Sequence, residues 1–295
     1  MVRALLARYR AFLFRETSPV PLARLRLVYG LYLLTYWPGL TDMLSLYFGP
    51  RGLGVAELTG SPHALVRGAA WLVGIGTAHF VPLFLAVALP ASLALALGYA
   101  TRVTALLVWM CASLGVTYVP VGTNSGDYLV RTTAWLVLVA SLAGHTARGR
   151  TAPIPMWSTR LFQLQLAIVY LFSGWHKVAH ADWYNGTALH YALLQRIWTW
   201  ADFSFLSEYP VITGLSTYAT LAFELWLFPI GVWVRSLRPA VLAAGLAFHV
   251  GIALSMKVFV FGAIMPILYL AFVEEEEWAA LRALTSRGSA DSRRR

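Results

Sequence analysis

The sequence is short of charge, of cysteine and of lysine, and the first two shortages exclude a class of protein and two kinds of site. Only 12% of the 295 residues are charged, whereas a soluble domain carries about 25%, so the polar side chains are too few to cover a soluble globule. The single cysteine, Cys111, excludes an internal disulfide and a cysteine-ligated metal cluster. Of the 23 basic residues, only Lys177 and Lys257 are lysines.

Apolar runs of membrane-spanning length are what the sequence has in abundance. Hydrophobic residues make up 59% of the chain, and the mean hydropathy is +0.64. Because a helix needs about 20 apolar residues to cross a bilayer, we predict an all-α, polytopic transmembrane helix bundle of about eight spans. The runs lie near 22–40, 79–97, 103–120, 128–144, 161–177, 211–234, 239–256 and 258–273, and a further segment, 62–77, either spans or lies at the interface.

The basic residues are divided unequally between the two sides of the membrane. With the N-terminus in the cytoplasm, 17 arginines fall on the cytoplasmic side and three on the other, or six basic residues with those near span ends. The positive-inside rule therefore predicts cytoplasmic N- and C-termini. We expect the membrane to be a bacterial plasma membrane. We predict a cytoplasmic amphipathic helix over 1–21, a transmembrane domain over 22–273 and a cytoplasmic tail over 274–295. The basic residues behind the net charge of +10 thus encode membrane topology, and we expect no nucleic-acid partner.

Ionisable residues within or beside the spans are the candidate functional residues, because each is costly to place in hydrocarbon. Gly174, His176 and Lys177 lie where the 161–177 run ends. A lysine withdrawn from water can act as a base, although Lys177 also fits a side chain that snorkels to the interface. Glu224 is the only acid in the middle of a span, so it must be protonated, paired or facing a wet cavity.

Four other ionisable residues each admit two interpretations. Asp127 and Arg131, at i and i+4, either pair across one helical turn or serve a site. His249 is either a hydrogen-bonded packing residue or a proton partner, and Lys257 either snorkels or anchors negative charge. By topology, these four residues and Lys177 fall on the outer half of the bundle, where they could converge on one outward-opening pocket.

No metal site is predicted. His176 and His180 stand at i and i+4, a spacing that metal ligands use, but a nearby carboxylate motif is missing. A lone pair of histidines is a weak signal.

Three stretches make the sequence resemble the HTTM (horizontally transferred transmembrane) domain family, which is related to the vitamin K-dependent gamma-carboxylases. The stretches are 98–102, the string 124–131, and the Tyr-Leu-Phe-Ser-Gly-x-x-Lys segment at 170–177. The resemblance covers roughly residues 20–275 and implies a membrane domain in which Lys177 deprotonates a reduced, vitamin K-like quinone at the outer face. The animal enzymes have a functional histidine where this chain has Gly126-Asp127, and their large lumenal substrate-binding domain has no counterpart here.

Two functions follow from these observations. The first is a quinol-dependent enzyme with Lys177 as base, His176 or His249 as proton partner, and Asp127, Arg131, Gly174, Glu224 and Lys257 as binding residues. The second is a non-catalytic membrane factor for maturation, export or immunity of a small secreted peptide. A small-solute transporter is a third hypothesis, but the lack of an internal sequence repeat counts against it. The enzyme hypothesis predicts that Lys177 is buried from bulk water beside a cavity open to the lipid or to the outer face. The peptide-factor hypothesis predicts an exposed apolar groove, with Lys177 merely at the interface.

Overall fold

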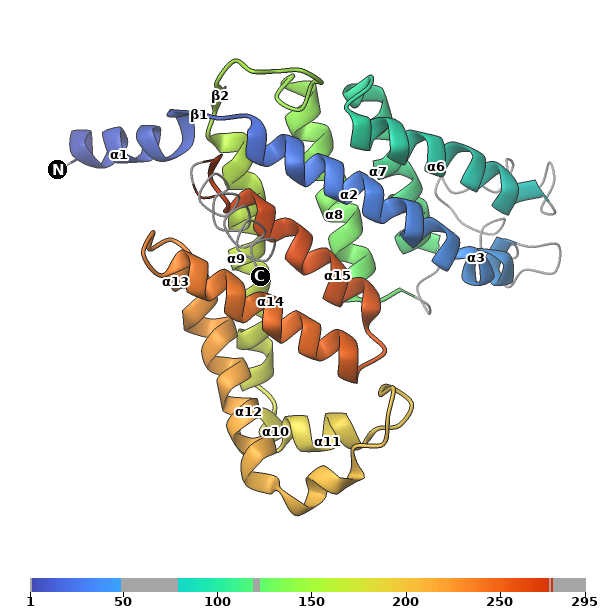
Figure 1. Cartoon of the computed structure of the whole chain (residues 1–295), viewed down its shortest axis with the longest axis vertical. Coiled ribbons are helices and arrows are strands. Elements are labelled where there is room, and N and C mark those ends of the chain that lie inside the picture. The colour runs from blue at the N-terminus through green and yellow to red at the C-terminus, as the bar shows by residue number, and fades with distance from the viewer. Residues whose placement is uncertain (1, 49–78, 119–122, 276, 278–295) are drawn as a thin grey trace, which may run out of the picture. The chain divides into compact units, whose positions relative to one another are not determined.

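The computed structural model describes residues 2–48, 79–118, 123–275 and 277, and most of them are helical (Figure 1). The chain divides into two compact units, residues 1–158 and 159–295. The prediction of a helical protein is thereby confirmed. The segment 62–77 and most of the expected C-terminal tail lie outside the described residues.

The first unit contains most of the N-terminal helices. Its long helices α2, α6, α7 and α8 form the bundle, in which α2 contacts α6, and α7 contacts both α6 and α8. Two short strands, β1 and β2, pair antiparallel beside them. The bounds are α1 (Val2–Phe14), β1 (Glu16–Thr17), α2 (Val20–Gly39), α3 (Thr41–Phe48), α6 (Phe80–Leu97), α7 (Thr101–Tyr118), α8 (Ser125–Leu142) and β2 (Ile154–Pro155).

Local sequence signals set the ends of these helices. A proline in the first turn starts α2, where the missing N–H costs no helical hydrogen bond. Gly98, with φ of +80°, ends α6 in the left-handed conformation, which glycine adopts without a Cβ penalty. Asn124 and Asp127 form a reciprocal capping box at the start of α8, so two otherwise unpaired backbone N–H groups are satisfied.

Close approach of α2 and α6 organises the core of the first unit. A Cβ on Gly30 would lie 2.7 Å from Cβ and 2.8 Å from Cα of Ala96. One helical turn earlier, the buried guanidinium of Arg26 donates hydrogen bonds to the carbonyls of Leu95 and Ala96, the latter at 2.7 Å. One end of α6 is thereby satisfied by a side chain from α2.

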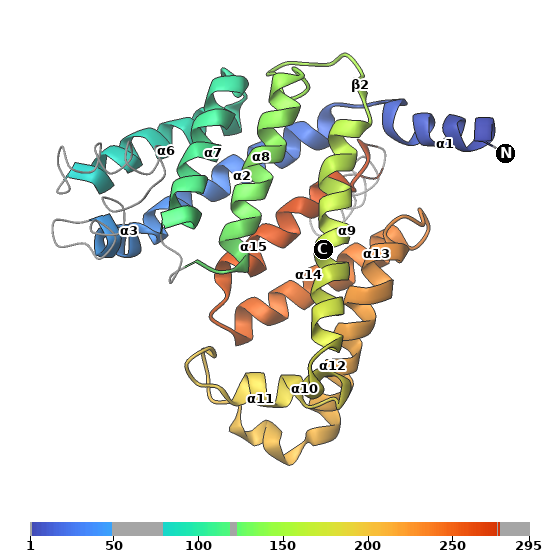
Figure 2. The ribbon, with the colours of Figure 1, turned by 180° about the vertical axis from the view of Figure 1, so that it is seen from behind.

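The second unit contains the remaining elements. Helix α9 lies beside α12 in both views of the ribbon (Figures 1 and 2), while the short α10 and α11 contact α12. The bounds are α9 (Trp157–Val178), α10 (Ala181–Tyr184), α11 (Ala188–Leu194), a 3-10 turn (Ser204–Glu208), α12 (Pro210–Ala222), a π-helical turn (Phe223–Leu227), α13 (Phe228–Gly231), α14 (Arg238–Ser255), α15 (Phe259–Leu268) and a 3-10 turn (Tyr269–Ala271).

Each of the eight apolar runs falls largely on helical residues in the structure. Within the described residues, three stretches are long and apolar enough to cross a bilayer: Phe80–Leu97, Pro210–Gly231 and Arg238–Ser255. At most 39% of the most apolar 18 residues in each stretch are buried. Much of their apolar surface therefore faces outward, as expected for lipid contact. The count of eight spans and the side of each terminus stay predictions.

The contact between α2 and α6 yields a test of stability. We expect Gly30→Ala to lower the free energy of unfolding by about 1–3 kcal/mol, because backbone atoms of α6 must move to admit the methyl group. The measurement is chemical denaturation of the purified protein in detergent micelles. Gly39→Ala, in the same helix but with nothing within 4 Å of its Cβ, is the matched control and should be neutral or slightly stabilising. Equal loss in both variants would contradict the role of this contact.

Candidate functional site

One face of α9 carries a stripe of small and polar residues along its second half. Ser173, Gly174 and Lys177 lie three, four and seven residues after Tyr170, which places them on the same side of the helix. The rise from Tyr170 to Lys177 is about 10 Å.

Lys177 and Glu224 form a buried ion pair. Nζ of Lys177 lies 2.5 Å from Oε2 and 2.6 Å from Oε1 of Glu224, and it also donates to Oγ of Ser173 at 2.7 Å. The Glu224 side chain is 4% exposed and that of Lys177 is 23% exposed. The ring centroid of Trp183 lies 5.1 Å from the same nitrogen, within range of a cation–π interaction. Of the three possibilities for Glu224, the structure shows pairing.

A π-helical turn places Glu224 beside Lys177. The turn, Phe223–Leu227, interrupts the path from α12 to α13 and holds more residues than an α-helical turn, which changes the direction of the side chains that follow. Phe223 and Glu224 are buried, whereas Trp226 is 60% exposed. Such turns are frequent at functional sites, and this one puts the single mid-span acid on the inward side.

Gly174 lets α9 approach this turn closely. A Cβ at position 174 would lie 2.8 Å from Cγ of Leu225 and 3.2 Å from Cβ of Glu224. The sequence predicted that Gly174 admits either a helix or a ligand, and the structure places the π-helical turn there. The glycine therefore allows the backbone carrying Lys177 to come within reach of the backbone carrying Glu224.

A second polar cluster lies further along the α9 stripe. Oη of Tyr170 is 2.7 Å from Nε2 of His249 and 2.5 Å from Oη of Tyr269. All three side chains are buried, and His249 is 0% exposed. The ring of Phe223 meets Tyr170 edge-on at 5.4 Å between centroids. His249 is thus a hydrogen-bonded core residue that joins α14 to α9, and its bond is to Tyr170 rather than to Lys177.

His176 and Lys257 lie away from the ion pair within the second unit. His176 is exposed, and it is one residue, or about 100° of helical rotation, from Lys177. The amine of Lys257 lies 3.5 Å from the carbonyl oxygen of Arg196 and 5.9 Å from the ring centroid of Trp200. Both contacts are to the segment that follows α11. The structure therefore brings together Lys177, Glu224 and Gly174, but not these two residues.

Asp127 and Arg131 belong to the first unit, where Asp127 is held by hydrogen bonds. Its Oδ1 accepts from Tyr36 Oη at 2.8 Å and its Oδ2 accepts from the backbone N–H of Asn124 at 2.8 Å. The guanidinium carbon of Arg131 instead lies 5.4 Å from the ring centroid of Tyr128. The described contacts thus replace the i to i+4 ion pair. Convergence of all five residues on one pocket stays a prediction.

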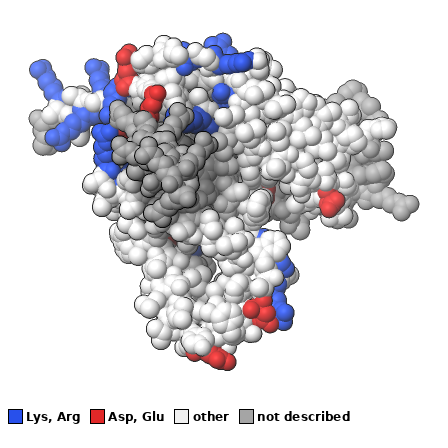
Figure 3. Space-filling view, in the orientation of Figure 1, with Lys and Arg blue, Asp and Glu red and all other residues white. Residues whose placement is uncertain are grey.

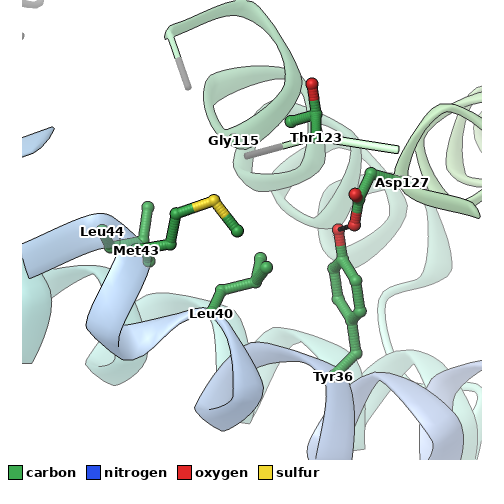
Figure 4. Close-up of a pocket in the computed structure, with 7 residues that line it drawn as sticks. All are labelled: Tyr36, Leu40, Met43, Leu44, Gly115, Thr123 and Asp127. Atoms are coloured by element: carbon green, nitrogen blue, oxygen red, sulfur yellow. Dashed lines mark hydrogen bonds between the residues drawn. The ribbon is translucent and has the colours of Figure 1, made fainter. Parts of the chain in front are cut away.

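A small pocket opens beside Asp127 (Figure 4). The hydroxyl of Tyr36 points at the carboxylate from one wall of the pocket, while Leu40, Met43 and Leu44 give the other wall apolar side chains. The lining residues are Tyr36, Leu40, Met43, Leu44, Gly115, Thr123 and Asp127.

Sequence reasoning missed the neutral partners of these charged residues. Ser173 and Trp183 complete the surroundings of Lys177, Tyr170 and Tyr269 bond His249, and Tyr36 bonds Asp127. The spacing of Tyr170 and Ser173 from Lys177 was the available signal, because all three share one face of α9. No comparable signal marked Tyr36 or Tyr269.

Apolar helices and a buried ion pair define a helical membrane protein with an ionisable centre, and a family match makes the assignment more specific. The model of the HTTM domain matches residues 66–278, and the chain belongs to this family. It is therefore an integral membrane protein related to the membrane domain of the vitamin K-dependent carboxylases. No curated protein and no solved structure matches the chain significantly.

The ion pair yields a prediction about stability. Lys177→Met leaves the Glu224 carboxylate buried without a partner, so we expect the free energy of unfolding to fall by about 3 kcal/mol. Adding Glu224→Leu removes the unpaired charge and should recover most of that loss. Denaturation in micelles measures both variants.

The matched control is the exposed ion pair between Arg196 and Asp202. Its closest N–O distance is 3.2 Å, and the side chains are 77% and 47% exposed. Hydrogen bonds from Ser204 lower the pKa of the Asp202 carboxyl, with a further contribution from Arg196. Because exposed pairs contribute little, Arg196→Met and Asp202→Asn should leave the unfolding midpoint nearly unchanged. A Lys177→Met variant as stable as these controls would show that the buried pair carries no stability.

Proposed function

We propose that this protein is a membrane enzyme that takes a proton from a lipid-soluble quinol at the ion pair of Lys177 and Glu224. The observation that supports the proposal is the pair itself. An amine with most of its surface buried is held 2.5 Å from a carboxylate that is 4% exposed. Ionisable groups placed at this cost in a membrane domain mark functional sites.

The pair can act as a base in two linked proton transfers. Lys177 passes one ammonium proton to the Glu224 carboxylate along the 2.5 Å contact, which leaves a neutral amine. The amine then accepts the hydroxyl proton of the substrate. In sum, Glu224 gains one proton, the substrate oxygen loses one, and Lys177 is again an ammonium ion that balances the new negative charge.

The surroundings of Lys177 fit a flat, apolar ring that carries an acidic hydroxyl. The lysine side chain keeps 23% of its surface exposed, so the amine is shielded but reachable. Trp183 offers an aromatic face beside it, with its ring centroid 5.1 Å from the amine. A reduced, vitamin K-like quinone would supply the hydroxyl when bound. The arginine distribution predicts that this site lies at the outer face of the membrane, and we propose that the membrane is a bacterial plasma membrane.

The test is turnover of a reduced naphthoquinone in the presence of oxygen by protein in nanodiscs. A deprotonated quinol that adds O2 gives a quinone epoxide and, once the proton is returned, one water molecule. Epoxide formation, measured by chromatography, should fall about 100-fold or more in Lys177→Met and in Glu224→Gln, since general bases contribute 10²–10⁴-fold. Arg196→Met and Asp202→Asn, the exposed pair, should retain wild-type turnover.

A third variant separates the base from the structural ion pair. Lys177→Arg keeps the positive charge beside Glu224, but a guanidinium group does not lose its proton in proteins. We expect this variant to fold with near wild-type stability and to lose turnover. A Lys177→Arg protein that keeps its turnover would refute the base role. A folded wild-type protein that turns over no quinol of a broad panel would refute the enzyme and favour the peptide-maturation factor.

A further inference from the structure

Helix α1 is not covered by the unit to which it belongs. None of its 13 residues is buried, and Val2, Leu5 and Tyr9 are 68%, 69% and 58% exposed. An isolated helix of this length is marginal in water. A helix with exposed large apolar side chains therefore needs another surface, and its residues indicate which surface that is.

The residues of α1 divide into two faces. Apolar side chains recur at intervals of three and four, and arginines border this stripe on both sides. By helical rotation, Arg3 and Arg10 flank one edge and Arg8 the other. This is the pattern of a helix that lies in a membrane interface with its arginines at headgroup level. The stripe consists of Val2, Leu5, Leu6, Tyr9, Phe12 and Leu13.

The charge within α1 and at the residue that follows it is of one sign. Residues 2–15 contain four arginines and no acidic residue, and Figure 3 shows basic side chains gathered over α1. The guanidinium carbon of Arg148 lies 4.3 Å from the ring centroid of Tyr99, a residue of the turn that follows α6. Arg150 donates a hydrogen bond to the carbonyl of Gly144 at 3.4 Å. These turns stand at the end of the first unit where β1 and β2 pair, so the basic surface continues from α1 onto the bundle.

Backbone hydrogen bonds fix where α1 leaves the bundle. The N–H of Met156 donates to the carbonyl of Arg15 at 2.9 Å, and Thr17 is paired with Ile154 in the two-stranded sheet. The C-terminal end of α1 is therefore held at the basic end of the first unit. A helix tethered in this way needs only a weak attraction to settle on a neighbouring surface.

We propose that α1 lies on the bilayer surface at this end of the first unit and binds the headgroups of anionic phospholipids. Its apolar stripe enters the acyl region, while Arg3, Arg8 and Arg10 contact lipid phosphates. Guanidinium groups bind phosphate oxygens in a bidentate manner. Each basic residue near an anionic surface favours the bound state by about fivefold, so three together give roughly 100-fold.

The test places a fluorophore on the apolar stripe of the full-length protein. Leu5→Cys in a Cys111→Ala background is labelled with a polarity-sensitive dye and reconstituted into two kinds of nanodisc. One contains phosphatidylcholine alone and the other phosphatidylcholine mixed with phosphatidylglycerol. In the mixed nanodiscs we expect a blue-shifted emission that brominated acyl chains quench, and in phosphatidylcholine a mostly water-exposed label.

Charge variants decide between headgroup binding and simple apolar contact. Replacing Arg3, Arg8 and Arg10 with glutamine should lower the ratio of embedded to exposed label roughly 100-fold in the mixed nanodiscs, whereas the triple lysine variant should keep most of it. Equal embedding in both lipids, or in the glutamine variant, would overturn the anionic-lipid assignment. A label exposed to water in both lipids would overturn the surface location. Neither readout depends on quinol turnover.

Discussion

A carboxylate buried in an apolar helix is the constraint around which the second unit is built. Removing a carboxylate and an ammonium group from water costs several kcal/mol for each ion, and only close, well-satisfied pairing offsets that cost. Three separate features meet this need at one point. The π-helical turn directs Glu224 inward, Gly174 removes the side chain that would hold α9 away, and Lys177 supplies the counter-charge together with Ser173.

The two units satisfy their buried charges by different means. In the first unit, Asp127 is bound by the hydroxyl of Tyr36 and a backbone N–H, and Arg26 is bound by backbone carbonyls at the end of α6. Partners of this kind fix a charge in place without a counter-charge beside it. In the second unit, Lys177 and Glu224 are both titratable, so a proton can move between them. This difference is why the second unit is the better candidate for chemistry.

Sequence patterns were sufficient for the long apolar helices but not for the pairing of Lys177 with Glu224. The length of each apolar run was enough to predict a helix there, because membrane spans are set by local composition. The scarcity of ionisable groups also marked Lys177 and Glu224 individually. Their contact joins residues 47 positions apart, and the π-helical turn that allows it has no signature in residue type. His249 shows the same limit, since its partner Tyr170 is one of 14 tyrosines.

Because lysine is scarce, chemical modification of amines can report on the state of the Lys177–Glu224 pair. Apart from the amino terminus, the chain has two amines, Lys177 and Lys257. Lys257 is exposed and would meet an acylating reagent at once, whereas the amine of Lys177 is engaged by Ser173 and Glu224. Acylation requires a neutral, accessible amine, so Lys177 reacts only after its amine has given a proton to Glu224 or has left the pair. The yield at Lys177 relative to Lys257 in the same molecules therefore reports how often the amine of the pair is neutral and accessible.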